Sequence, residues 1–239
     1  MKNPKVIKKY TNEGFNTRLK KLKDAVNTAL LDVDNSHVKI QKGNAKTGIN
    51  CWTVSLMPVI DCRNCTRCKM ECYDFWYDMR YPAIIKDRAK NSAIHKVDPK
   101  RYWREIDAQI KANFITELRI NVGGDLNETD FEEVARLGRR NPRCDFLFFT
   151  KNYDDMNRFL EKHRFPKNVH AILSVWKGIK MDNPYNLPES HVLYADNTTT
   201  APEYGAVYCG GNCSECHFSK TERGCWGLKK GEHVIFSAH

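Results

Sequence analysis

The sequence lacks any long apolar run. No segment approaches the roughly 20 apolar residues that a membrane-spanning helix needs, and the mean hydropathy is -0.63. The chain starts with a basic stretch, MKNPKVIKKYTNEGF, and the apolar centre of a secretory signal does not follow it. These absences predict a cytoplasmic protein with no membrane partner.

Internal repeats and low-complexity tracts are also missing. Of the 239 residues, 41% are hydrophobic and 28% are charged, which is typical of globular rather than disordered chains. This length suffices for one large domain or two small ones with a buried core.

Acidic residues are in short supply. The chain has 29 Asp and Glu against 39 Lys and Arg, so its net charge is +10, and most of the excess lies in the first 50 residues. A basic segment can bind nucleic acid by neutralising phosphates, which makes nucleic acid a candidate partner. Lys20, Lys21 and Lys23 also fit the solvated face of an ordinary amphipathic helix, and the sequence leaves both interpretations open.

The apolar pattern predicts strands that alternate with helices. The expected strands are Trp52–Ile60, Leu118–Val122, Phe146–Phe149, His170–Val175 and Val192–Tyr194. The expected helices cover 15–31, 81–113 in two parts, Thr129–Arg139 and Asp154–Lys162. Thr129 is expected to cap its helix in a capping box with Glu132.

Strands and helices in this order indicate an α/β fold of βα units with a mostly parallel sheet. Right-handed crossovers allow such a sheet to curl into a partial TIM-like barrel. We therefore expect a basic N-terminal tail and helix over 1–42. A βα partial-barrel domain would cover 43–198, and a cysteine-rich C-terminal extension 199–239.

Ten cysteines stand out in a chain expected to be cytoplasmic, where disulfide frameworks are rare and metal ligands are the common use. Four of them, Cys62, Cys65, Cys68 and Cys72, form one run with the spacing C-x2-C-x2-C-x3-C. Thiolates this close in a loop can converge on one [4Fe-4S] cluster. Zinc also takes four thiolates, although its sites usually split into two separated pairs.

This run follows the first expected strand, so it lies at the carboxyl end of a strand, the functional face of α/β barrels. A cluster held by Cys65, Cys68 and Cys72, with Cys62 as an alternative or fourth ligand, leaves one iron open. S-adenosylmethionine is a chelating ligand suited to an open iron, and we expect it as a cofactor.

The second constellation is Gly123-Gly124-Asp125, directly after an expected strand. Glycines let the backbone approach a ligand closely, and a carboxylate can accept a hydrogen bond from an amine. This layout is similar to that of radical S-adenosylmethionine enzymes, which carry Gly-Gly-Glu at this place. The candidate cofactor-binding residues are Asn121, Gly123, Gly124, Asp125, Ser174 and Trp176.

Lys151 follows the strand that contains Phe149, and it is the second candidate catalytic residue beside Asp125. A lysine at this face can pair with a carboxylate or a phosphate. The alternative is that these strand-end residues are ordinary solvated residues of the rim.

A second group of four cysteines lies near the end of the chain: Cys209, Cys213, Cys216 and Cys225. Because it follows the βα series, we expect a closed site there, either an auxiliary iron–sulfur cluster or a structural zinc. His217 could replace one cysteine as a ligand.

The chain resembles the phage gene product 88 family over more than three quarters of its length. The residues that carry the resemblance are Ser55-Leu56, the first four cysteines with Tyr73, Tyr81-Pro82, Arg88, Asn91, Gly123-Gly124-Asp125, Thr150-Lys151, Pro166, Asn168, Ser174, Trp176, Gly211-Asn212-Cys213, Cys225-Trp226 and Leu228 to Glu232. This family shares with radical S-adenosylmethionine enzymes the order of a cysteine run followed by two glycines and an acid, but its cysteine spacing differs.

Our leading hypothesis is therefore an iron–sulfur enzyme that cleaves S-adenosylmethionine to start radical chemistry, with an electron donor such as flavodoxin or ferredoxin. The alternative is a metal-stapled nucleic-acid-binding protein without this chemistry, which two four-cysteine sites and a basic N-terminus would also suit.

Overall fold

The computed structural model describes residues 11–43, 47–48, 50–63, 65, 67–77, 81–194, 196–213, 216 and 224–237. Its helices are α1 (Asn12–Leu30), α2 (Tyr73–Tyr77), α3 (Pro82–Val97), α4 (Pro99–Ala112), α5 (Glu128–Arg140) and α6 (Tyr153–Lys162). Its strands are β1 (Ile40–Gln41), β2 (Cys51–Val54), β3 (Glu117–Ile120), β4 (Asp145–Thr150), β5 (Val169–Ser174), β6 (Glu189–Leu193), β7 (Ala206–Tyr208) and β8 (His233–Ser237).

All eight strands belong to one sheet, in the order β1-β2-β3-β4-β5-β6-β8-β7. The edge strand β1 pairs with β2 in antiparallel fashion, and all other neighbours are parallel. The carboxyl ends of β2 to β6 therefore meet at one edge of the sheet. The sequence prediction of a mixed α/β fold with a mostly parallel sheet is confirmed.

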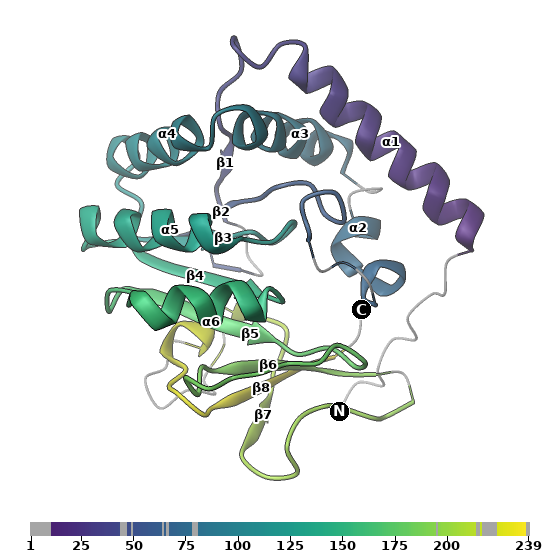
Figure 1. The fold of residues 1–239 in the computed structure, drawn as a ribbon, viewed down its shortest axis with the longest axis vertical. Coiled ribbons are helices and arrows are strands. Elements are labelled where there is room, and N and C mark those ends of the chain that lie inside the picture. The colour runs from purple at the N-terminus through teal and green to yellow at the C-terminus, as the bar shows by residue number, and fades with distance from the viewer. Residues whose placement is uncertain are drawn as a thin grey trace.

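The main core lies between this sheet and the helices α4, α5 and α6, which cover one of its faces (Figure 1). Alternate residues of β3 and β4 point into it, among them Leu118, Ile120, Phe146 and Phe148, all fully buried. The ring of Phe148 stacks on Phe131 of α5 with their centroids 5.7 Å apart. Burying side chains of this size contributes about 1.5–3 kcal/mol each, so this face fixes the register of the βα units.

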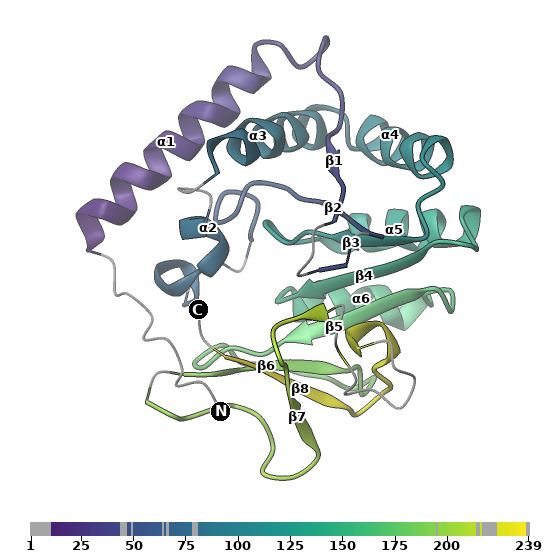
Figure 2. The same cartoon turned by 180° about the vertical axis from the view of Figure 1, so that it is seen from behind.

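A second core joins the N-terminal helix to the rest of the molecule. Phe15, Leu22 and Val26 form the buried stripe of α1, spaced by seven and four residues as one helix face requires, and they pack with residues of α2 and α3. The guanidinium of Arg18 on the same stripe donates a hydrogen bond of 3.1 Å to the carbonyl of Phe75. Figure 2 shows α1 lying across α3, outside the sheet.

The opposite face of the sheet is concave. Phe149 of β4 and Phe236 of β8 have ring centroids 5.9 Å apart, although two strands lie between them in the sheet. In a flat sheet three strand spacings would separate them by about 14 Å, so the sheet is strongly curved. No pairing between β1 and β7 closes it within the described part of the chain, and a complete barrel is not shown.

Several expected boundaries are corrected. The strand expected over Trp52–Ile60 ends at Val54, because Ser55 and Leu56 leave the ladder to bond with the turn after β3. The cap of α5 is Asn127, not Thr129, and its capping box partner is Asp130, not Glu132.

The strands β1, β7 and β8 and the short helix α2 were not expected. They are short or lie in segments rich in loops, where apolar periodicity is too brief to be recognised. The segment 199–239, expected as an extension, supplies two strands of the common sheet. None of the described helices has the length and apolar character to cross a membrane.

Candidate metal and cofactor site

The first cysteine run lies on the loop that leaves the carboxyl end of β2. Asp61 anchors the start of this loop, because its carboxylate accepts hydrogen bonds from the Met57 backbone amide at 2.8 Å and the Ser92 hydroxyl at 2.6 Å. Its carbonyl also accepts a hydrogen bond of 3.0 Å from the amide of Asp125. The loop is thus fixed to α3 and to the turn after β3.

The structure brings three sulfurs of this run into contact and places the fourth, Cys72, within reach of their charge. The thiol of Cys65 is hydrogen-bonded to those of Cys62 and Cys68, and these contacts raise its pKa. Cys72 follows a 3-10 turn at Lys69–Glu71; burial raises its pKa to about 12, and the nearby charges of Asp74, Cys62 and Cys68 add to this. Four thiols in one place are a ligand set for an iron–sulfur cluster or zinc.

The thiol of Cys68 is made more acidic by its neighbours. The hydrogen bond from Cys65 lowers its pKa to about 6, and the ammonium group of Lys151 acts in the same direction. Burial would lower the pKa of Lys151, but the charges of Cys68 and Asp125 outweigh it and raise that pKa. Lys151 therefore stays cationic beside the sulfurs, where it favours the thiolate form that binds metals.

The two glycines after β3 are required by packing within the protein. A Cβ on Gly123 would overlap the carboxylate of Asp74, and a Cβ on Gly124 would lie 2.7 Å from that of Leu56. Gly124 also has a φ of +80°, which favours glycine. These close approaches are to the chain itself, so they explain the glycines without a ligand.

Asp125 braces two strand ends. Its carboxylate accepts hydrogen bonds from the backbone amides of Lys151 and Leu126, at 2.9 and 2.8 Å, and from the hydroxyl of Thr150. Burial raises its pKa, while these hydrogen bonds oppose the rise. Both carboxylate oxygens thus have partners inside the protein, and the side chain joins the end of β3 to the end of β4.

Asn121 is different, because it is only 5% exposed and neither atom of its side-chain amide has a hydrogen-bond partner. It follows β3 directly, and its φ of 55° lies in the left-handed region. A buried amide left without partners costs about 1–3 kcal/mol. At the carboxyl end of the sheet this amide therefore has a donor and an acceptor that no described residue uses.

The remaining candidates lie at the ends of β4 and β5. The ammonium of Lys151 lies 5.6 Å from the centroid of the Trp176 ring, and this ring packs edge-on against Tyr194 with centroids 5.6 Å apart. The carbonyl of Ser174 accepts a hydrogen bond of 2.5 Å from the hydroxyl of Tyr153, so Ser174 is held through its backbone.

A polar cavity of about 220 Å³ opens beside the cysteine loop, and Asp61, Arg63, His95 and Asp125 are among its lining residues. His95 pairs with Asp130 at 2.7 Å. Burial lowers the pKa of His95, but the hydrogen bond and charge of Asp130 outweigh it, so the pKa is raised overall.

The second cysteine group lies near Cys51 of β2 and Arg119 of β3. Burial raises the pKa of Cys225 to about 12; Arg119 opposes this, and the charges of Cys209, Cys213 and Cys216 add to it. Burial raises the pKa of Cys51, the first residue of β2, and the charge of Cys213 adds to this rise. His217, the alternative ligand, lies outside the described residues.

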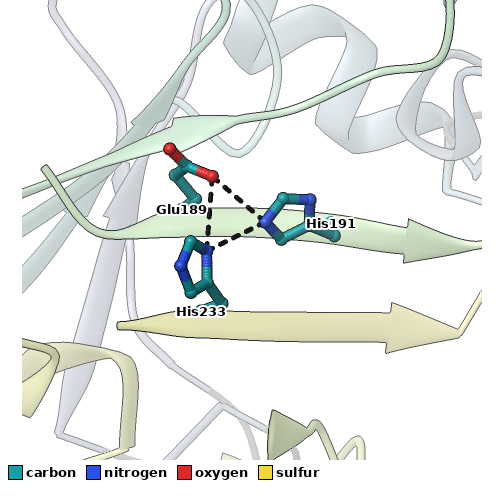
Figure 3. Close-up of side chains that lie close together, drawn as sticks. All are labelled: Glu189, His191 and His233. Carbon is teal, nitrogen blue, oxygen red and sulfur yellow. Dashed lines mark hydrogen bonds and ion pairs between the residues drawn. The ribbon is translucent and has the colours of Figure 1, made fainter. Parts of the chain in front are cut away.

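The sequence analysis missed one group. Glu189 and His191 of β6 and His233 of β8 direct side-chain atoms at one another (Figure 3). The ligand atoms of these three side chains all lie within 4.8 Å of one another. Within the described part of the chain, no other group of three metal-binding side chains is as close. Glu-x-His on a strand was the available signal, since residues two apart share a face, but His233 is 42 residues from His191.

The structure describes some of the basic N-terminal residues that the sequence makes candidates for binding nucleic acid. Lys20, Lys21 and Lys23 lie on the exposed side of α1, and Lys20 pairs with Asp24 at 2.8 Å. Residues 1–10 lie outside the described part of the chain.

Comparison with known proteins identifies one family. The family model described as gene product 88 matches residues 21–222. Curated proteins and solved structures give no match. Since the matched range covers most of the 239 residues, the chain belongs to the gene product 88 family.

Proposed function

We propose that this member of the gene product 88 family is an iron–sulfur enzyme of the radical S-adenosylmethionine type. The observation that carries the proposal is the position of the first cysteine group. The thiols of Cys62, Cys65 and Cys68 are in contact, with Cys72 nearby, on a loop at the carboxyl edge of a curved parallel sheet, beside a cationic lysine. Ligand sites of α/β sheets lie outside the carboxyl ends of the strands, and here the curved sheet acts as a partial TIM-like barrel.

The donor set fits a [4Fe-4S] cluster. Cys62, Cys65 and Cys68 are spaced by two residues and Cys72 by three, as in ferredoxin-type runs. Burial is the largest cause of the raised pKa of Cys72, so this ligand would lie on the inner side of a bound cluster. Ligation by Cys65, Cys68 and Cys72 leaves one iron for an exchangeable ligand, with Cys62 as the alternative fourth ligand.

Asn121, Lys151 and Trp176 would hold S-adenosylmethionine. The unpartnered amide of Asn121 supplies a donor and an acceptor for the amino and carboxylate groups of the methionine part. Lys151 would pair with the carboxylate, and the indole of Trp176 offers an apolar face. Asp125 positions Lys151 through the backbone, instead of binding the amino group as its sequence position suggests.

The chemistry that this pair of cofactors supplies, when bound, is one-electron cleavage of a carbon–sulfur bond to methionine and a 5′-deoxyadenosyl radical, which removes hydrogen from a substrate. A flavodoxin or ferredoxin would deliver the electron. The second cysteine group would hold an auxiliary iron–sulfur cluster or a structural zinc.

Anaerobic purification with iron and sulfide analysis tests the first step. The wild-type protein is expected to hold about four irons, or about eight if both groups carry clusters. Replacing Cys68 by Ser should remove about four irons per chain. Cys144→Ser is the matched control, because Cys144 is buried and lies outside both groups.

EPR spectroscopy of the reduced protein tests the second step. Addition of S-adenosylmethionine should change the cluster signal of the wild-type protein. Asn121→Gly keeps a residue that accepts the left-handed backbone and removes the amide, so this variant should retain its iron but need more S-adenosylmethionine for the same change. A spectrum that ignores S-adenosylmethionine would refute the radical mechanism. Zinc without sulfide would instead favour the metal-stapled nucleic-acid-binding protein.

A further inference from the structure

Three side chains on neighbouring parallel strands direct their ligand atoms at one point (Figure 3). The Oε2 atom of Glu189 lies 3.3 Å from Nε2 of His191 and 3.3 Å from Nδ1 of His233. The two ring nitrogens lie 3.2 Å apart. The His191 side chain is 2% exposed, Glu189 13% and His233 21%, so the group is largely withdrawn from water but is reached from one side.

Hydrogen bonds cannot satisfy all three contacts at once. If both imidazoles donate to the carboxylate, two N–H groups face each other across 3.2 Å. If one imidazole donates to the other, the acceptor nitrogen turns its lone pair toward the carboxylate oxygen. With the carboxylate ionised, every assignment of protons to these two nitrogens leaves one unfavourable contact, whereas a cation at the centre makes all three favourable.

The separations also match those of a coordinated ion. Zinc binds imidazole nitrogen and carboxylate oxygen at about 2.0–2.1 Å with tetrahedral geometry, which puts two ligand atoms about 3.3 Å apart. The three observed separations are 3.2, 3.3 and 3.3 Å. We propose that Glu189, His191 and His233 form a zinc site with a fourth position open to water or to a ligand.

Two further residues hold the ligands in place. The second nitrogen of His191, Nδ1, lies 3.0 Å from the hydroxyl of Thr200, which fixes the ring and leaves Nε2 for the metal. The amide of Asn183 donates a hydrogen bond of 2.8 Å to Oε1 of Glu189, which leaves Oε2 for the metal. Outer contacts of this kind orient the ligands of zinc sites.

The site differs from the two cysteine groups in its ligands, because its three donor atoms are nitrogen and oxygen and none is sulfur. Two histidines and one glutamate are the ligand set of catalytic zinc sites, in which the open position takes water or polarises a carbonyl or phosphoryl oxygen. The chemical class of ligand for the open position is therefore water, or an oxygen-bearing anion or carbonyl group.

Zinc content and zinc X-ray absorption of the anaerobically purified full-length protein test the proposal. After exposure to zinc and removal of loosely held metal, the wild-type protein should hold one zinc per chain with nitrogen and oxygen ligands only. His233→Ala and Glu189→Gln should lose this ion or bind it more than about 100-fold more weakly, with iron and sulfide unchanged. His37→Ala is the control, because His37 is 76% exposed and lies outside the group.

Glu189→Gln preserves the shape of the side chain and the oxygen that Asn183 contacts, so it should fold even if a larger change does not. A wild-type protein without nitrogen- and oxygen-bound zinc would overturn the proposal. So would variants that hold this zinc as tightly as the wild type. Sulfur-bound zinc would add a Zn–S distance of about 2.3 Å to the spectrum and raise the zinc content above one per chain; it would bear on the cysteine groups alone.

Discussion

The backbone amide of Lys151 donates a 2.9 Å hydrogen bond to Oδ2 of Asp125. This bond joins the turn after β3 to the end of β4 and holds Lys151 beside Cys68. A residue whose sequence context suggests cofactor binding thus has a structural role, and the predictions below test such roles one at a time.

Asp125→Ala should lower the free energy of unfolding by about 1–3 kcal/mol, because it leaves the partly buried backbone amides of Lys151 and Leu126 without an acceptor. Urea denaturation of the protein without added S-adenosylmethionine measures this change. Asp154→Ala, on the first turn of α6 and exposed, is the control and should change little. Unaltered stability of Asp125→Ala would mean that the carboxylate is not a brace.

Gly124→Ala should be more destabilising than Gly205→Ala. Both glycines have φ near +80°, but a Cβ at Gly124 would meet Leu56 whereas that at Gly205 meets open space. The left-handed backbone alone costs about 1–2 kcal/mol, and overpacking adds about 1–3 kcal/mol. Thermal or urea unfolding of the two variants separates these contributions, and equal losses would contradict the packing argument.

The pair of His95 and Asp130 should make stability depend on pH. The pKa of His95 is raised above 6.5 in the folded protein, so the folded state binds the proton more tightly than the unfolded state. This stabilisation is fully present below a pH of about 6.5 and is lost as the pH rises through the folded pKa.

Urea unfolding at about pH 5.5 and pH 8.5 measures this effect. His95→Gln should remove this part of the pH dependence, while the exposed His37→Gln should retain it. The idea fails if the wild type and His95→Gln change in parallel between the two pH values.

Thr200→Val should weaken zinc binding at the histidine site by about 10–100-fold, because the ring of His191 loses the hydroxyl that orients it. Competition with a zinc chelator measures the affinity. Thr198→Val is the matched control, since the hydroxyl of Thr198 contacts Asp196 and not the histidine. Identical affinities for both variants would show that this outer contact does not matter.

Local patterns were sufficient for much of the fold. The apolar alternation around Leu118 and Phe146 predicted strands of the observed sheet, and Pro82 and Pro99 marked the starts of two helices. The strands β7 and β8 were missed, because β8 is stabilised by pairing with both β6 and β7, which the sequences of these segments do not show.

For the candidate site, too, some features follow from local sequence and others from the tertiary structure. The sequence by itself determined the two cysteine groups and the family, because closely spaced thiols and short motifs can be recognised from neighbouring residues along the chain. Only the tertiary structure decided that Asp125 is a brace, that Asn121 lacks partners, and that His233 meets Glu189 and His191. Those facts depend on which strands become neighbours, and parallel pairing brings together residues that the chain separates widely.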